Sequence, residues 1–126
     1  MSVAATPEAV MAAYVDRINR HDFDLLISLI DPEASFWFSS GTYQGHAAVR
    51  EAFERTWQRL ANETYWLEDL IWIAKGVEAA SCTYRFHWRA TIDGETAEGK
   101  GRGTTVLAKG ESGWHIVHEN LSTFPE

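Results

Sequence analysis

Hydrophobic residues recur at every third or fourth position near the N-terminus, which predicts helices there. Thr6-Pro7-Glu8 is typical of a helix start, because Thr caps the first turn and Pro fits the first helical position. The apolar face of this first helix consists of Val10, Met11, Tyr14, Val15 and Ile18. Asp22 is a candidate N-cap for a second, shorter helix that Asp31-Pro32 ends. That helix carries Leu25, Leu26, Leu29 and Ile30.

A third helix is predicted over residues 46–62, after a short strand at residues 35–39 and a loop that contains Gly41 and Gly45. One face of this helix is apolar and consists of Val49, Phe53, Trp57 and Leu60. The opposite face is charged and consists of Arg50, Glu51, Glu54, Arg55 and Arg59. Opposite charges four residues apart on that face are typical of a helix surface in contact with solvent.

The second half of the chain alternates between β-rich runs and turns, which predicts a four-stranded antiparallel meander. The runs cover residues 64–74, 78–92, 95–109 and 114–122. Asp93-Gly94 between two such runs is a strong hairpin signal. Three N-terminal helices followed by this meander indicate an α+β fold, with the helices packed on one face of a curved antiparallel sheet.

The turns predict how the strands pair. The Asp93-Gly94 turn pairs Ile92 with Glu95 and so sets three large rings opposite three glycines, an arrangement in which rings cover a bare strand. The pairs are Trp88 with Gly99, Phe86 with Gly101 and Tyr84 with Gly103. A four-residue turn at residues 110–113 gives a second set of pairs. They are Lys109 with Trp114, Thr105 with His118 and Gly103 with Asn120.

This register divides the sheet into two faces. The first is mainly aromatic and consists of Cys82, Tyr84, Phe86, Trp88, Thr105, His118, Asn120 and Ser122. The second is charged and consists of Arg85, His87, Arg89, Glu98, Lys100, Arg102 and Glu119. We expect the aromatic face to pack against the helices, because its burial gives the larger hydrophobic gain. For the run at residues 64–74, a two-residue turn would point Asp69 inward, whereas a three-residue turn would point Trp66 and Glu68 inward.

Composition limits the function classes. A chain of 126 residues is long enough for one domain, which we predict to span residues 1–126. The 11 Lys and Arg against 18 Asp and Glu give a net charge of −7, which argues against nucleic-acid binding. The single cysteine, Cys82, excludes an internal disulfide. Without a signal-peptide pattern or an apolar run of about 20 residues, we expect a cytoplasmic protein with no membrane contact.

Two polar residues on the predicted aromatic face suggest a binding site. His118 and Asn120 lie among large rings, and glycines leave space beside them. Apolar walls with a few convergent polar groups are typical of a ligand cavity. The alternative is that both are core residues, whose hydrogen bonds are satisfied by each other, by Tyr84 or Thr105, or by a buried water. The sequence leaves both interpretations open.

Strand geometry argues against other chemistry. On a regularly alternating strand, His115 and His118 would point to opposite faces, which disfavours a two-histidine metal site, and we expect no metal or other cofactor. Cys82 and His118 lie about 9.5 Å apart across an intervening strand, which is too far for a hydrogen bond between nucleophile and base. No glycine-rich phosphate loop opens a helix, so a nucleotide site is not predicted.

Four segments of the chain carry a family resemblance. They are Tyr14-Val15-Asp16-Arg17-Ile18-Asn19 with His21-Asp22, Asp31-Pro32-Glu33-Ala34 before a strand, residues 45–53, and residues 113–122. In this order and spacing they resemble SnoaL-like proteins of the nuclear transport factor 2-like superfamily. The last segment is also similar to the association domain of calcium/calmodulin-dependent protein kinase II. The resemblance implies a cone-shaped, cystatin-like α+β fold, a pocket between the bent sheet and the helices, and a homodimer formed through the outer sheet face.

The resemblance also implies roles for single residues. Tyr14 falls where ketosteroid isomerases place the tyrosine that binds the oxyanion. The base aspartate and the second oxyanion-binding acid of those enzymes fall near Phe38 and Thr105, which cannot carry out that work, so steroid isomerisation is disfavoured. The kinase association domain has a histidine where this chain has Asn120, and an Asn cannot serve as a general base.

Three functions are compatible with the sequence. The first is binding of an apolar or aromatic small molecule by a homodimer. Its ligand-binding residues are predicted to be Trp37, Phe53, Trp57, Tyr84, Phe86, Trp88, Thr105 and Asn120. The second is an isomerase, polyketide cyclase or lyase that uses His118 as general acid/base and Tyr14 as oxyanion donor. The third is a non-catalytic homo-oligomerisation module, which packs its outer face on another subunit through Arg85, His87, Arg102 and Glu119.

Overall fold

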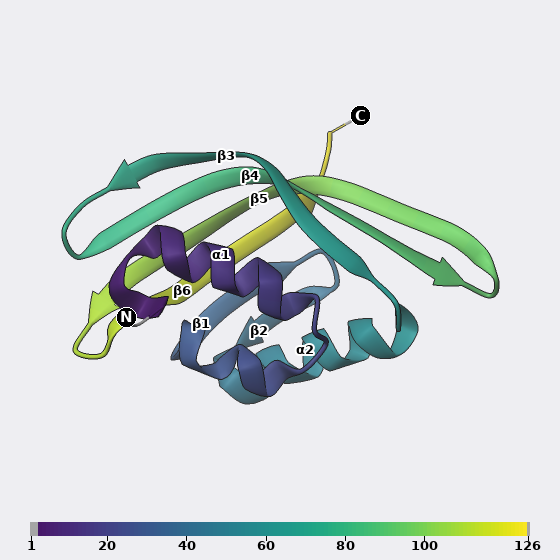
Figure 1. The fold of residues 1–126 in the computed structure, drawn as a ribbon, viewed down its shortest axis with the longest axis horizontal. Coiled ribbons are helices and arrows are strands. Elements are labelled where there is room, and N and C mark those ends of the chain that lie inside the picture. The colour runs from purple at the N-terminus through teal and green to yellow at the C-terminus, as the bar shows by residue number, and fades with distance from the viewer. Residues whose placement is uncertain (1–2, 126) are drawn as a thin grey trace.

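The computed structural model describes residues 3–125 and shows an α+β fold in which a curved sheet covers two helices (Figure 1). The helices are α1, Pro7–Ile18, and α2, Gly45–Arg59. Three short 3₁₀ turns accompany them: η1, Val3–Ala5; η2, Phe23–Leu25; and η3, Ile27–Leu29. The predicted fold class is confirmed. The single domain over residues 1–126 stays a prediction, and its residues 1, 2 and 126 lie outside the described residues.

Six strands form one sheet in the order β2-β1-β6-β5-β4-β3. They are β1, Ile30–Phe38; β2, Gly41–Gln44; β3, Thr64–Lys75; β4, Ala79–Ile92; β5, Glu95–Gly110; and β6, Gly113–Thr123. Neighbouring strands are antiparallel except β1 and β6, which run parallel. The predicted meander is therefore present as β3 to β6, and β1 and β2 extend the sheet beyond it.

The segment between α1 and α2 differs from the prediction. The predicted second helix is replaced by η2 and η3, although Asp22 does cap the first of these turns by accepting the N–H of Asp24 at 3.0 Å. Asp31-Pro32 lies inside β1 instead of ending a helix. The strand accommodates Pro32 because pairing with β6 is interrupted between Ile30 and Ser35. The predicted loop after β1 contains strand β2, and α2 ends at Arg59 rather than at residue 62.

The β4–β5 hairpin has the predicted register. Ile92 pairs with Glu95 across the Asp93-Gly94 turn, and both turn residues have positive φ, as a tight hairpin turn requires. The predicted pairs of rings and glycines are all present: Trp88 with Gly99, Phe86 with Gly101 and Tyr84 with Gly103. A Cβ atom at any of these glycines would overlap the ring opposite it, so the bare strand is what allows the rings to lie flat on the sheet.

A β-bulge changes the faces of β6. The observed pairs are Lys109 with Trp114, Leu107 with Ile116, Val106 with His118, and Thr105 with Glu119. Val117 is therefore one extra residue on β6, and it reverses the alternation of the side chains that follow it. The predicted inward positions of His118 and Asn120 are wrong, because both lie on the outer face. The predicted outward position of Glu119 is also wrong, because Glu119 is buried at 1% exposure.

Strand β3 is irregular, and neither alternative for it is right. Its pairing with β4 shifts between Glu68 and Ile71, where Asp69 has a φ of 55°, and again between Trp72 and Ala74. The three residues considered for the inner face all lie on the outer face. Trp66 stacks on His87, Glu68 lies 3.5 Å from the His87 ring, and Asp69 lies 3.6 Å from Arg85. Tyr65 and Leu67 pack against the core instead.

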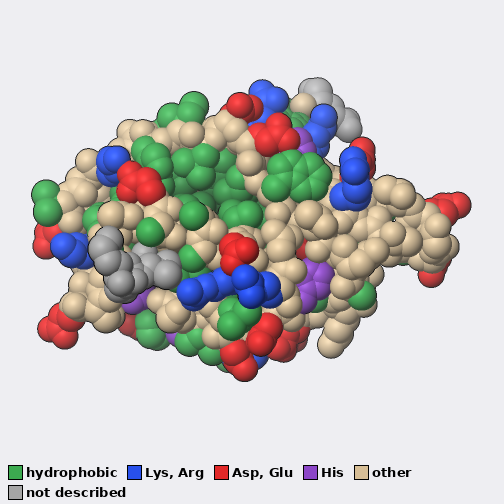
Figure 2. All heavy atoms as spheres, viewed as in Figure 1, with side chains coloured by type: hydrophobic (Ala, Val, Ile, Leu, Met, Phe, Trp, Pro, Cys, Tyr) green, Lys and Arg blue, Asp and Glu red, His purple; other side chains and the backbone are tan. Residues whose placement is uncertain are grey.

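The core lies between the inner face of the sheet and the two helices. Its largest fully buried side chains include Tyr14, Phe23 and Phe36. Figure 2 shows hydrophobic side chains gathered between α1 and strands β3 and β4. No helix within residues 3–125 has the length and apolar character needed to cross a membrane.

Candidate functional site

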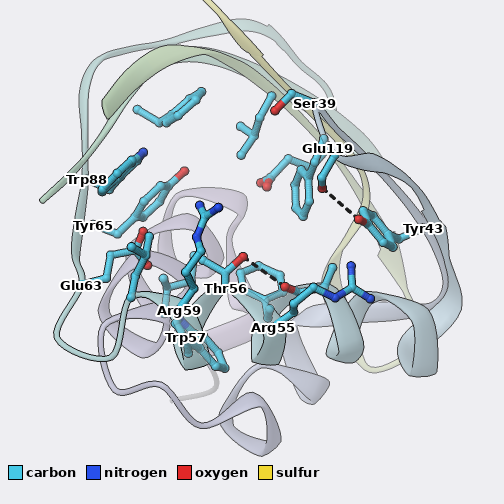
Figure 3. A pocket seen from close by; sticks show the side chains of 18 of the residues that line it. Ser39, Tyr43, Arg55, Thr56, Trp57, Arg59, Glu63, Tyr65, Trp88 and Glu119 are labelled. Atoms are coloured by element: carbon cyan, nitrogen blue, oxygen red, sulfur yellow. Dashed lines mark hydrogen bonds between the residues drawn. The ribbon is translucent and has the colours of Figure 1, made fainter. Parts of the chain in front are cut away.

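A cavity of about 360 Å³ lies between the inner face of the sheet and the helices (Figure 3). Eight aromatic side chains line it: Tyr14, Phe38, Tyr43, Phe53, Trp57, Tyr65, Phe86 and Trp88. Its charged residues are Arg55, Arg59, Glu63 and Glu119. A mainly aromatic wall with a few polar groups is the usual character of a small-molecule site.

On the side of the cavity that the helices form, contacts between aromatic rings fix the positions of the side chains. Phe53 meets Tyr14 edge-on, with ring centres 6.5 Å apart, and lies tilted against Trp57 at 5.4 Å. Trp57 in turn stacks on His21, with ring centres 5.3 Å apart and planes only 11° from parallel. Rings that contact one another in this way have few alternative rotamers, so the wall keeps its shape.

The end of α1 anchors the opposite wall at the start of β3. The Asn19 amide accepts the N–H of Tyr65 at 2.7 Å and donates to the Tyr65 carbonyl at 2.8 Å. A ring nitrogen of His21 lies 3.0 Å from the Glu63 carbonyl oxygen. These bonds hold Glu63 and Tyr65 at the cavity, where Figure 3 places them beside Trp88.

Glu119 is the buried carboxyl group of the site. Tyr14 donates a hydrogen bond to its Oε2 at 2.9 Å, and Thr105 donates to Oε1 at 3.1 Å. The Tyr84 hydroxyl lies 3.2 Å from Oε1 and 2.7 Å from the Thr105 hydroxyl. Burial raises the pKa of Glu119 to about 7, and the bonds from Tyr14, Thr105 and Tyr84 oppose that rise. Glu119 therefore populates both its neutral and its charged form near neutral pH.

A second carboxyl group at the cavity has a similar pKa. Burial raises the pKa of Glu63 to about 7, and the positive charge of Arg59 opposes the rise. The phenols of Tyr14 and Tyr84 have pKa values well above their ordinary range, because of burial and the nearby Glu119 charge. These phenols therefore remain hydrogen-bond donors at neutral pH.

The buried thiol has no nucleophilic character at neutral pH. Cys82 is fully buried, and burial raises its pKa to about 12, so that the thiolate is not populated. Within residues 3–125, no three His, Cys, Asp or Glu side chains are grouped as ligands for a metal ion.

The structure separates the predicted site residues into three groups. The first group lines the cavity and consists of Tyr14, Phe53, Trp57, Phe86 and Trp88. The second group, Tyr84 and Thr105, lies behind Glu119 and bonds to it. The third group is on the outer face and consists of Trp37, His118 and Asn120. On this face, the Ser35 hydroxyl lies 2.8 Å from His118 Nδ1. For this third group, the predicted position inside the pocket is wrong.

The sequence does contain a signal for the missed residue Glu119. Trp114 and Ile116 are apolar at even positions, whereas Leu121 is the one apolar residue among positions 118–123 and is odd. If all three point to the core, an extra residue must lie between Ile116 and Leu121. An extra residue that precedes Glu119, as Val117 does, turns Glu119 inward.

Comparisons with known proteins agree with this architecture. A nuclear transport factor 2-like superfamily protein from Salmonella enterica serovar Typhimurium is 26% identical, with a TM-score of 0.84 over 93% of this chain and 87% of that chain. A cystatin-like fold protein from Caulobacter vibrioides is 15% identical, with a TM-score of 0.79 over 94% of this chain and 87% of that chain. A protein from Streptomyces avermitilis, provisionally assigned as a dehydratase of the NTF2-like family, is 16% identical, with a TM-score of 0.80 over 94% of both chains.

The likeness to the last two structures shows the fold alone. A search of curated protein sequences finds no match to the chain. The sequence profile of the SnoaL-like domain matches residues 8–126, which is nearly the whole chain. The protein therefore belongs to the SnoaL-like domain family, within the nuclear transport factor 2-like superfamily.

Proposed function

We propose that this protein binds an apolar or aromatic small molecule in the cavity between the sheet and helices α1 and α2. The observation that carries this proposal is the set of eight aromatic side chains that line one cavity. A SnoaL-like domain in this fold supports a small-molecule-binding protein or one of isomerase or dehydratase type. The aromatic wall favours a ligand with a flat apolar body, because stacked and edge-on ring contacts add to the gain from burial.

Calorimetric titration with 2-naphthalenemethanol, a neutral aromatic probe, tests this proposal. Trp88→Ala removes one wall of the cavity, and we expect it to weaken binding about tenfold, which corresponds to about 1.4 kcal/mol. Trp37→Ala is the matched control, because Trp37 is half exposed on the outer face. The proposal fails if the probe does not bind, or if Trp37→Ala weakens binding as much as Trp88→Ala.

The buried carboxyl favours a second candidate function, which is proton transfer to and from the bound molecule. The Glu119 carboxylate would take a proton from the carbon next to a ligand carbonyl, and the electron pair of the broken C–H bond would form the enolate. The carboxyl would then return a proton to the same or a conjugated carbon, which completes an isomerisation without a further reactant. A group with a pKa near the working pH is suited to both steps.

Deuterium exchange tests this second function separately. In D₂O, the protein is expected to exchange the α-protons of 2-tetralone faster than buffer does, as followed by proton NMR. Glu119→Gln keeps the size of the side chain but cannot carry the proton, so the enhancement should disappear. His118→Ala is the control, because His118 lies on the opposite face of the sheet. Loss of exchange in His118→Ala, or its retention in Glu119→Gln, would contradict the role of Glu119.

The outer face supports a further part of the proposal, a homodimer. The resemblance to nuclear transport factor 2-like proteins implies a dimer through the outer sheet face, and that face exposes Trp37 at 50% and Ile71 at 59%. A groove lined by Ile71 also contains Asp69, Arg85 and Arg102, so this face offers both negative and positive groups to a second copy related by a two-fold axis. By light scattering we expect a dimer that Ile71→Glu converts to a monomer, whereas Val77→Glu in the exposed β3–β4 turn does not. A wild-type monomer at all concentrations would refute this part.

A further inference from the structure

We infer that the ligand of the cavity is a carboxylic acid, whose apolar or aromatic body lies against the rings and whose carboxylate lies beside Arg59 at the mouth. This inference rests on the proposed binding function, and it adds the charge and the orientation of the ligand.

Arg59 differs from the other arginines of α2 in its partners. Arg50 is bonded to Asp24 at 2.6 Å and to Glu54 at 3.3 Å, and Arg55 is bonded to Glu51 at 2.8 Å. Arg59, in contrast, has no carboxylate oxygen within 4.0 Å among residues 3–125. Its side chain points from the end of α2 into the cavity (Figure 3). The cavity thus has a cation at its mouth with hydrogen-bond donors to spare.

The interior of the cavity does not offer an anion a comparable position. Apart from the arginines, its charged groups are the carboxyls of Glu63 and Glu119, and the Tyr14 hydroxyl already donates to Glu119. The other polar groups of the lining are neutral, and their hydroxyls belong to Ser39, Ser40, Tyr43, Thr56, Tyr65, Ser122 and Thr123. A ligand carboxylate placed deep among these groups would face two acids that lose their protons as the pH rises. At the mouth, the same carboxylate keeps contact with solvent and accepts hydrogen bonds from a guanidinium, whose planar donors match a carboxylate well. The apolar part of the ligand then fills the space between the aromatic rings of the cavity.

A purely structural role for Arg59, in which it stabilises the end of α2, would also explain a cation at this position. Arg59 lies in the last turn of α2, where unpaired carbonyl groups favour positive charge. That role affects the stability of the protein and is indifferent to the charge of a ligand. Charge selectivity therefore distinguishes the two.

The experiment compares three probes with the same ring system by calorimetry at pH 7.5 and low salt: 2-naphthoic acid, 2-naphthalenemethanol and 2-naphthylmethylamine. We expect the wild type to bind the acid about fivefold more tightly than the alcohol, as a partly exposed ion pair allows. Arg59→Gln should reduce this ratio to about one, and Arg59→Lys should keep part of it. Arg89→Gln is the matched control, because Arg89 pairs with Glu98 on the outer face and should leave the ratio unchanged.

Each other outcome overturns the inference in a recognisable way. If acid and alcohol bind equally in the wild type, the binding function stands and the inference fails. The inference also fails if Arg59→Gln keeps the preference for the acid, even with a lower stability, because Arg59 then serves only the helix. Tighter binding of the amine would assign charge recognition to Glu63 and Glu119 instead. If none of the three probes binds, the proposed function itself is wrong.

Discussion

The two faces of strand β6 give adjacent residues opposite environments. Glu119 points inward, is buried, and lies among the hydroxyl groups of Tyr14, Tyr84 and Thr105. His118 points outward, is half-buried, and contacts Ser35 and the Trp37 ring. Burial raises the pKa of the carboxyl to about 7, into the range where histidine ordinarily titrates. The environment of a side chain, more than its type, therefore decides which residue is suited to proton transfer.

Charged groups on the two faces are also stabilised differently. On the outer face, charges pair with one another in water, as Arg89 does with Glu98 at 3.2 Å, and such exposed pairs contribute about 0–1 kcal/mol. On the inner face, the one fully buried carboxyl is held by hydrogen bonds from neutral hydroxyls and has no ion-pair partner among the described residues. Substitutions on the inner face should therefore have the larger effects.

The largest expected effect is at a glycine under the rings. At Gly101, a Cβ would overlap both the Phe86 ring and the backbone carbonyl of Ser122, and that carbonyl cannot move without disturbing β6. We expect Gly101→Val to lower the free energy of unfolding by about 3 kcal/mol or more, as measured by urea denaturation. Gly110→Ala is the control, because a Cβ at Gly110 meets no atom closer than 3.9 Å. Equal losses in both variants would show that the rings do not require a bare strand.

The next effect concerns the dependence of stability on pH. Glu119 has a pKa of about 7 in the folded protein and close to 4.5 in the unfolded chain. Between these values, the folded protein holds a proton that the unfolded chain has lost, so stability falls as the pH rises through this window and levels off above about 7. Each pH unit of the window corresponds to about 1.4 kcal/mol, which gives a loss of up to about 3 kcal/mol.

Urea denaturation of the wild type and Glu119→Gln between pH 4.5 and 8 measures this effect. The difference in unfolding free energy between the two proteins should move in favour of Glu119→Gln as the pH rises. Glu63→Gln should show the same direction, because burial also raises the pKa of Glu63 to about 7. A difference that stays constant with pH would mean that Glu119 titrates at its ordinary value and is not the buried acid of the site.

A smaller effect is expected when a single donor to Glu119 is removed. Tyr14→Phe leaves Oε2 without its 2.9 Å hydrogen bond, and bonds to a charged acceptor are worth about 1.5–3 kcal/mol. We therefore expect a loss of about 2 kcal/mol at pH 8, where Glu119 is charged, and a smaller loss at pH 5, where it is neutral. Tyr43→Phe is the control, because the Tyr43 hydroxyl bonds to Ser40 and not to Glu119. A loss that is independent of pH would contradict the link between the two groups.

The sequence predicted those parts of the sheet in which alternation is unbroken. The β4–β5 hairpin needed only the Asp93-Gly94 turn and the period of two, and all of its predicted pairs are present. In β6 the extra residue Val117 reverses the alternation of the side chains that follow it. Counting residues from the turn therefore assigned His118 and Glu119 to the wrong faces. In β3 the positive φ of Asp69 marks a similar break, which residue types alone did not reveal.

The site was predicted only as far as it depends on large rings. Phe53, Trp57, Phe86 and Trp88 line the cavity because the hydrophobic gain from burial dictates which face they occupy. Glu119 was not predicted as a residue of the cavity, because a carboxylate on a strand is ordinarily a surface group. Its burial depends on partners that come from α1, β4 and β5, and that assembly exists only once the sheet has folded over the helix.

The smallest expected effect is at His118, the outward-pointing neighbour of Glu119. His118→Ala removes one hydrogen bond to Ser35 and one edge-on contact with Trp37, both on the outer face, so the loss of unfolding free energy should be about 1 kcal/mol or less. Binding of 2-naphthalenemethanol, measured by calorimetry, should be unchanged, since the imidazole does not line the cavity. Ser35→Ala should reproduce the small stability loss without affecting the probe. If His118→Ala instead weakens probe binding tenfold while Ser35→Ala does not, the imidazole reaches the ligand and the assignment of faces after Val117 is wrong.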